Sequence, residues 1–219
     1  MELLKQLEIE TSNEQLYEQA LTHTSYANEE NVASYERLEY LGDAVLELVM
    51  SEYLYLTTDK DEGDMTKLRA HYVCENALYE YSLNLELNDH LKLGKGESES
   101  GGKYRKAIVA DIFEAFIGAL FLDKGLEGVK EFMYKHVIPM IESNEIDFLG
   151  DYKSTLQELV QTDKRSLEYV VINEEGPSHN KMFTVIVKID NIIYGKGIAH
   201  SKKEAEQEAA RDALEKSAR

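Results

Sequence analysis

Residues 36–44 have the sequence ERLEYLGDA, and this stretch decides how the first part of the chain is interpreted. Its acids Glu36, Glu39 and Asp43 are spaced at i, i+3 and i+7. At roughly 100° per helical residue, the three side chains fall within roughly 60° of one another on one helix face. The opposite face carries an apolar stripe that is expected to bury against a core: Leu38, Leu41, Val45 and Leu48. The stretch therefore predicts a helix that holds three carboxylates rigidly at the edge of a core.

A second helix, expected over residues 108–122, repeats this design with Asp111 and Glu114 at i, i+3. Its other residues are almost all apolar and none is basic, so the helix is expected to be buried. Ala115 and Gly118 on its acidic face are small enough to let another helix approach closely. Acids on a helix face are usually just solvated, but buried carboxylates need a partner. A hard divalent cation such as Mg²⁺, which prefers oxygen ligands, is the partner that these residues favour.

The residue pattern does not indicate covalent catalysis, a histidine metal site or a nucleotide-binding loop. No Ser/His/Asp order suggests covalent catalysis, and the six histidines lack the spacing of metal ligands. His23 is expected to be structural. The glycine-rich residues 94–106 miss the spacing of a phosphate-binding loop by one residue. We interpret them as a flexible loop and expect no nucleotide cofactor.

Charge is distributed unevenly along the 219 residues. The chain has 24 basic and 42 acidic residues, a formal net charge of −18, which taken alone argues against a nucleic-acid partner. Residues 151–219 contain 11 basic and 12 acidic residues, which leaves 13 basic and 30 acidic for residues 1–150. The acidity therefore belongs to the first two-thirds of the chain, and the last third is close to neutral.

The hydrophobic pattern changes near residue 150. Before this point nearly every segment has helical spacing, and Pro139 is expected to close the last helix. After it the pattern predicts a helix, three strands and a long helix, over residues 154–160, 167–172, 182–189, 192–198 and 201–214. We expect an all-α domain followed by an α+β domain of order α-β-β-β-α, with boundaries at residues 1–146, a linker at 147–151, and 152–219.

The chain carries no sign of a membrane or secretory destination. No apolar run approaches the roughly 18 residues that a membrane helix needs, and the start, MELLKQLEIE, lacks the cleavage site of a secretory signal. A single cysteine, Cys74, cannot form an internal disulfide and fits a reducing cytoplasm. We expect a cytoplasmic protein with no membrane partner.

Residues 36–44 resemble the signature motif of the ribonuclease III family. Three further blocks follow in the family's order: DEGDMTKLRA at residues 61–70, LGKG at 93–96 and ADIFEA at 110–115. The resemblance implies a homodimeric endoribonuclease that hydrolyses phosphodiester bonds in double-stranded RNA by a metal-activated water. It also implies 5′-phosphate and 3′-hydroxyl ends, and processing of ribosomal-RNA precursors and other structured RNA.

The resemblance also assigns roles to particular acids. The acidic site of each subunit corresponds to four residues of this chain: Glu39, Asp43, Asp111 and Glu114. By resemblance, Glu39, Asp111 and Glu114 hold Mg²⁺, with Mn²⁺ as a substitute, and Asp43 and Glu114 match the positions usually given as the active-site residues. Glu36 and Glu62 match accessory acids that line the cleft. Tyr40 matches an aromatic position near the dimer contact, a role compatible with packing in the core.

Residues 152–219 resemble a double-stranded RNA-binding domain. The resemblance rests on YKSTLQEL at residues 152–159, GPSH at 176–179, GKG at 195–197 and SKKEAEQEAA at 201–210. It implies that Gln157 and Glu158 face one minor groove and that His179 enters the next. Lys202 and Lys203 would meet phosphates across the intervening major groove, where a helix amino terminus adds partial positive charge.

Two other functions remain open at this point. One is a non-catalytic protein that keeps the fold and only binds double-stranded RNA. The other is a helical structural protein that binds calcium or magnesium and has no RNA partner. Retention of every acid named above argues against the first.

Overall fold

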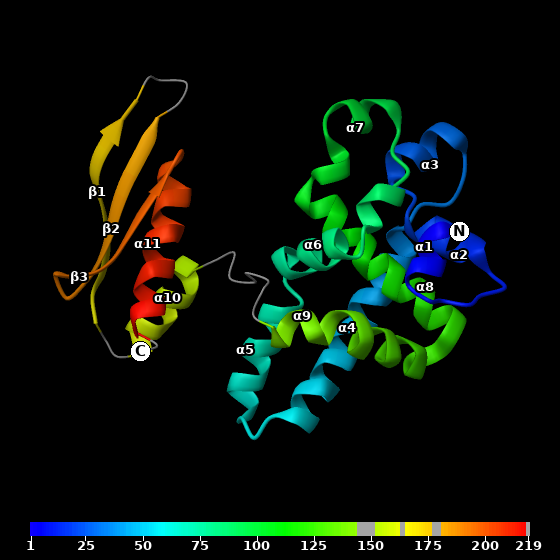
Figure 1. Ribbon diagram of the computed structural model, residues 1–219, viewed down its shortest axis with the longest axis horizontal. Coiled ribbons are helices and arrows are strands. Elements are labelled where there is room, and N and C mark those ends of the chain that lie inside the picture. The colour runs from blue at the N-terminus through cyan, green and yellow to red at the C-terminus, as the bar shows by residue number, and fades with distance from the viewer. Residues whose placement is uncertain (144–151, 163–164, 177–180, 218–219) are drawn as a thin grey trace. The chain divides into compact units, whose positions relative to one another are not determined.

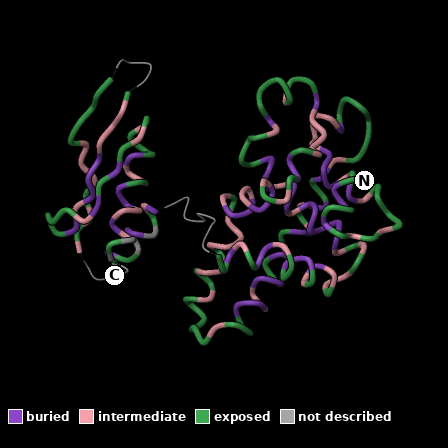
Figure 2. Tube along the Cα trace, viewed as in Figure 1, coloured by how far each residue is buried: buried purple, intermediate pink, exposed green. Residues whose placement is uncertain are grey.

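The computed structural model describes residues 1–143, 152–162, 165–176 and 181–217. The chain divides into two units, Met1–Phe148 and Leu149–Arg219, each with its own hydrophobic core (Figures 1 and 2). The predicted linker at residues 147–151 lies outside the described residues, so its bounds stay a prediction.

The first unit contains helices and no strand in its described part, which confirms the predicted all-α domain (Figure 1). Its α-helices are α1 (Glu2–Gln6), α2 (Glu14–Ala20), α3 (Thr24–Glu30), α4 (Glu36–Thr57), α5 (Glu62–Tyr72), α6 (Glu75–Asn84), α7 (Lys95–Glu99), α8 (Lys106–Phe132) and α9 (Ile138–Glu142). Two short 3₁₀ turns, η1 (Leu87–His90) and η2 (Gly102–Tyr104), and a π-helical turn, η3 (Met133–Val137), complete the unit.

Helices α4 and α8 cross in direct backbone contact at a pair of glycines. A Cβ atom on Gly42 would overlap the carbonyl oxygen of Glu114 and lie 2.8 Å from the backbone nitrogen of Gly118. A Cβ atom on Gly118 would overlap the carbonyl oxygen of Leu38. The expectation that Gly118 allows a close approach is therefore met, and Gly42 provides the matching gap on α4.

The buried side chains of α8 explain why it lies at the centre of the unit. Ile112, Phe113, Phe116 and Ile117 are completely buried, and they share one core with Leu46 and other residues of α4. The apolar character of α8 on all sides, read from its sequence, fits this position. Gly125, with φ of +70°, interrupts the helix after this buried stretch.

Several expectations about the first unit are corrected. Leu48 and Tyr40 are 54% and 84% exposed, so neither packs in the core of its own chain. Pro139 does not close a helix; it lies in the first turn of α9, where its missing N–H costs nothing. Residues 94–106 are not a plain loop, because they form α7 and η2, and Arg105 pairs with Glu97.

The second unit has the predicted order of one helix, three strands and one helix. Its elements are α10 (Tyr152–Thr162), β1 (Leu167–Glu175), β2 (Met182–Ile189), β3 (Ile192–Ala199) and α11 (Lys202–Ser217). The strands form one antiparallel sheet of order β1-β2-β3, with β2 in the centre. Both helices share a core with one face of this sheet (Figure 1).

Glycines also set how closely β3 approaches α11. A Cβ atom on Gly195 would overlap the carbonyl oxygen of Ala209, and one on Gly197 would overlap that of Ala205. The alanines on this side of α11 are fully buried. The GKG and Ala-rich segments noted in the sequence are therefore the two halves of one tight contact.

None of the helices in the described ranges is long and apolar enough to cross a membrane.

Gly42→Ala is expected to destabilise the first unit, because the new methyl group overlaps the backbone of Glu114. Overpacking typically costs about 1–3 kcal/mol, and a clash with backbone belongs at the upper end of that range. Gly96→Ala is the matched control, since a Cβ atom there meets nothing within 4 Å. Thermal unfolding followed by circular dichroism measures both variants. Equal melting temperatures for Gly42→Ala and the parent protein would contradict the crossing geometry.

Candidate active site

The acids of α4 lie in its first two turns. Glu36 and Glu39 occupy the first turn, where the partial positive charge of the helix amino terminus favours carboxylates. Asp43 follows one turn later. Glu39 is half-buried, whereas Glu36 and Asp43 are exposed, and Glu36 accepts a hydrogen bond of 2.9 Å from the Ser34 hydroxyl.

The acids of α8 face α4 across the glycine crossing. Asp111 and Glu114 are one turn apart and half-buried, less deeply than the apolar surroundings in the sequence suggested. The backbone of Glu114 touches Gly42, the neighbour of Asp43, so the crossing itself brings the two helices' acids together. Asp111 Oδ2 accepts a hydrogen bond of 3.0 Å from the hydroxyl of Tyr35.

Burial and neighbouring acids raise the pKa values of Glu39 and Glu114. Burial is the largest cause for Glu114, whose pKa rises to about 8, and repulsion from Asp43, Glu39 and Asp111 adds to it. The pKa of Glu39 rises to about 7, again through burial first and then through Asp111, Glu36 and Asp43. The structure thus brings the four predicted site acids into one cluster, with Glu36 at its edge.

No basic side chain within the described ranges forms an ion pair with Glu39, Asp43, Asp111 or Glu114. Surface acids elsewhere do have such partners; Glu8, for example, pairs with Lys135 at 2.6 Å. Burial without a counter-charge is costly for carboxylates. The cluster is therefore an electrostatically unfavourable arrangement that a bound cation would relieve.

Glu62 lies apart from these acids in a single chain. It is exposed at the start of α5 and lines a groove between α4 and α5 with Leu48, Tyr55 and Met65. Tyr55 is sixteen residues beyond Glu39 on α4, roughly 24 Å along the helix at 1.5 Å per residue. The accessory role of Glu62 therefore stays a prediction, because this residue does not lie beside the four clustered acids within one copy of the chain.

The predicted RNA-facing lysines lie at the amino end of α11. Lys202 and Lys203 are exposed in its first turn, and Ser201 caps the helix by accepting a 3.2 Å hydrogen bond from the amide of Glu204. Lys202 also forms an ion pair of 2.8 Å with Glu174 of β1. The pKa of the Glu174 carboxyl is lowered by Lys202 and, more weakly, by Lys181.

Lys181 is a basic residue of this surface that the sequence did not reveal. Its ammonium group lies 3.4 Å from Glu174, and both it and Lys202 lie over the ring of Phe183, at 6.0 and 5.4 Å from the centroid. Gln157 is exposed on α10, and its contact with RNA stays a prediction. His179 and the side chain of Glu158 lie outside the described part of the chain.

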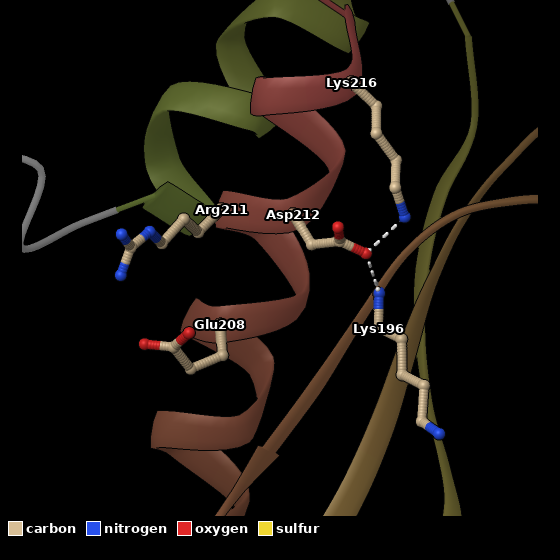
Figure 3. A pocket seen from close by; sticks show the side chains of 5 residues that line it. All are labelled: Lys196, Glu208, Arg211, Asp212 and Lys216. Atoms are coloured by element: carbon tan, nitrogen blue, oxygen red, sulfur yellow. Dashed lines mark hydrogen bonds and ion pairs between the residues drawn. The ribbon is translucent and has the colours of Figure 1, made fainter.

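A second group of charged residues lines a pocket on the far part of α11 (Figure 3). Asp212 accepts hydrogen bonds from the Lys196 amide at 2.8 Å and from the Lys216 ammonium at 2.5 Å. Lys196 belongs to β3, an edge strand, whose amide would otherwise be open to solvent. These contacts fasten β3 to α11 and give the pocket a structural role.

Comparison with known proteins places both units in one family. The family model described as ribonuclease-III-like matches residues 13–141, and the double-stranded RNA binding motif matches residues 152–217. The chain belongs to the ribonuclease III family. It is 49% identical over 213 residues to ribonuclease 3 of Streptococcus pneumoniae, covering 95% of this chain and 92% of the relative. It is 50% identical over 206 residues to ribonuclease 3 of Streptococcus gordonii, covering 92% and 89%.

A solved structure agrees with this placement. The nuclease domain of ribonuclease III from Campylobacter jejuni superposes with a TM-score of 0.59 at 37% identity, covering 63% of this chain and 94% of that one. The predicted helical ribonuclease III domain and the following double-stranded RNA-binding domain are therefore confirmed.

A ribonuclease III family member uses a divalent metal ion, and the acid cluster fits one by its donor chemistry. Carboxylate oxygens are the ligands of hard divalent cations, and within the described residues these carboxylates form no ion pair. Within the described residues, no three His, Cys, Asp or Glu groups are already arranged around a common point. The fit therefore rests on the donor set and its electrostatics.

In the metal-free ribonuclease, stability is expected to fall as the pH rises from about 5 to about 8. Because the folded pKa values of Glu39 and Glu114 lie above the ordinary value of 4.5, the folded state binds more protons than the unfolded state in this range. Melting temperatures measured in a chelator at several pH values test this. Glu114→Gln should flatten the decline.

Glu131→Gln is the control for this experiment, since Glu131 is an exposed residue of α8 away from the cluster. It should follow the parent protein. Identical pH slopes for Glu114→Gln and the parent would contradict the burial and repulsion assigned to Glu114.

Proposed function

We propose that this ribonuclease III family member is an endoribonuclease that hydrolyses phosphodiester bonds in double-stranded RNA. The observation that carries the proposal is the cluster of four acids at the α4–α8 crossing, which lacks basic partners within the described residues. The matching double-stranded RNA binding motif in the same chain supports the choice of substrate. A phosphodiester is an anion, so it can approach such a cluster only when cations neutralise the acids.

The proposed metal ligands are Glu39, Asp111 and Glu114, with Mg²⁺ as the ion and Mn²⁺ as a substitute. When bound, the ion lowers the pKa of a water molecule and stabilises charge on the phosphoryl oxygens. The rigid crossing of α4 and α8 keeps the carboxylates in place before RNA arrives. Asp43, which is more exposed than Glu39, extends the acidic surface toward solvent, and Glu36 and Glu62 are accessory acids in this proposal.

The products proposed for this reaction carry 5′-phosphate and 3′-hydroxyl ends. Carboxylates are ligands of hard divalent cations, and a bound cation can activate water, so water is the proposed nucleophile. By resemblance to the family, we propose ribosomal-RNA precursors and other structured RNA as the substrates, and the cytoplasm as the compartment. No nucleotide cofactor is required by this chemistry.

We also propose that the protein acts as a homodimer. Tyr40, Leu48 and Tyr55 recur at seven- and eight-residue spacing on α4, and all are more than half exposed. Leu48 and Tyr55 line the groove beside α5 as well. The nuclease domain of Campylobacter jejuni ribonuclease III has structural flexibility in a region involved in dimer formation. This likeness supports the proposal of a dimer for the present chain. A face this apolar is suited to a second copy of the chain.

In the second unit, we propose that Lys202 and Lys203 meet RNA phosphates, with Gln157, Glu158 and His179 facing the minor grooves. Two exposed ammonium groups at a helix amino terminus form a suitable site for phosphate. Lys181 joins them in this proposal, because it shares Glu174 with Lys202.

Glu114→Gln is expected to reduce cleavage of long double-stranded RNA by about 100-fold or more, because a charge-stabilising group is lost. RNA binding should be retained, since the lysines of the second unit are unchanged. Cleavage with and without Mg²⁺, end-group analysis and gel-shift titration provide the readouts. A parent protein that binds but never cuts would establish the non-catalytic alternative, and parallel loss of binding and cleavage in the variant would contradict the site.

Lys202→Ala with Lys203→Ala is expected to weaken binding of all duplex sequences similarly. The slope of log affinity against log salt should become shallower by about 1 for each lysine that meets a phosphate. Lys188→Ala, at the opposite end of β2 from Lys181, is the control and should bind like the parent. No binding of duplex RNA by the parent, or binding without salt dependence, would instead remove the RNA partner and favour a helical metal-binding protein.

A further inference from the structure

Tyr35 is held rigidly at the start of α4. It is 4% exposed, its carbonyl accepts the amides of Leu38 and Glu39 at 2.8 and 3.0 Å, and its own amide donates to the Thr22 carbonyl at 2.9 Å. The ring packs against the imidazole of His23, with centroids 5.7 Å apart. His23 is in turn fixed as the cap of α3. The phenol ring therefore has little freedom to turn.

The hydroxyl of Tyr35 reaches the acid cluster. It donates to Asp111 Oδ2 at 3.0 Å, across 76 positions of sequence. Burial, and then the negative charge of Asp111, raises the pKa of this phenol, so the hydroxyl keeps its proton and remains a donor.

Asp111 differs from the other acids because of this contact. Of the four acids, Asp111 is the one that accepts the hydrogen bond from the Tyr35 hydroxyl. The bond lowers the pKa of Asp111, which opposes the rise that burial causes. Within the described residues no hydrogen bond lowers the pKa of Glu39 or Glu114, and these pKa values reach about 7 and about 8.

We propose that Tyr35 is a positioning residue for the metal site, which holds one oxygen of Asp111 and thereby orients the carboxylate toward the ion. This inference rests on the proposed function, because it takes Asp111 as a metal ligand. Groups that hydrogen-bond a metal-ligating side chain restrict its rotation, so the ion meets a ligand already in place. The sequence around Tyr35 gives no sign of this role, because the residue resembles an ordinary aromatic residue before a helix.

Tyr35→Phe removes the hydroxyl and keeps the ring that packs against His23. Mn²⁺ binding to the full chain without RNA, measured by isothermal titration calorimetry, should weaken by about 10-fold or more, since such second contacts typically contribute 10–100-fold. In cleavage assays, the Mn²⁺ concentration for half-maximal rate should rise by the same factor. The rate at saturating Mn²⁺ should stay within about twofold, as expected when only binding is lost.

Tyr17→Phe is a matched control. Tyr17 is completely buried and its hydroxyl donates to Asp123 Oδ2 at 2.9 Å, a similar tyrosine–aspartate bond outside the acid cluster. Tyr17→Phe should lower the melting temperature about as much as Tyr35→Phe, yet leave Mn²⁺ affinity unchanged. Equal Mn²⁺ affinity in Tyr35→Phe and the parent, or equal weakening in both phenylalanine variants, overturns the proposal.

Glu114→Gln separates this inference from the proposed function. If Glu114→Gln weakens Mn²⁺ binding and Tyr35→Phe does not, the metal site stands and the role of Tyr35 is wrong. If neither variant weakens binding, the acid cluster is not the metal site and both proposals fail.

Discussion

The close contact between α4 and α8 is the constraint on which the rest of the first unit depends. Gly42 and Gly118 let the two backbones touch, and any side chain at either position would separate them. Glu39, Asp43 and Glu114 lie about one turn or less from these glycines, and Asp111 lies one turn before Glu114 on α8, so the crossing brings the acids together. The same contact that stabilises the fold therefore forces like charges together, a cost that a structure with no functional need for them would avoid.

The two units of the chain arrange their charged side chains in opposite ways. In the first, the clustered carboxylates form no ion pair within the described residues, and burial and repulsion raise the pKa values of Glu39 and Glu114. In the second, acids and bases are interleaved: Glu174 lies between two lysines, and Asp212 joins α11 to β3. The net charge of −18 averages over these arrangements and says little about either. Local placement decides which partner each unit can meet.

Sequence patterns predicted the elements and the four clustered acids well, because helical spacing and the family motifs are local features. They failed where the outcome depends on distant residues. Leu48 lies on the same apolar stripe as the buried Val45, yet it is exposed. Helical spacing alone cannot distinguish a side chain buried in the core from one on an exposed face of the kind proposed to bind a second copy of the chain. Tyr35 and Asp111 are 76 positions apart, and only the folded chain shows that they meet. Residues 94–106 looked flexible by composition, yet the Arg105–Glu97 pair helps to order them.

The shared pairing of Lys181 and Lys202 with Glu174 affects the phosphate contact proposed for these lysines. Free lysine side chains lose up to about 2 kcal/mol of rotamer entropy when they are immobilised. Here the two ammonium groups are already held beside one carboxylate and over one aromatic ring before any phosphate arrives. Part of that ordering therefore takes place during folding, and a phosphate that replaces the carboxylate finds its cations preorganised.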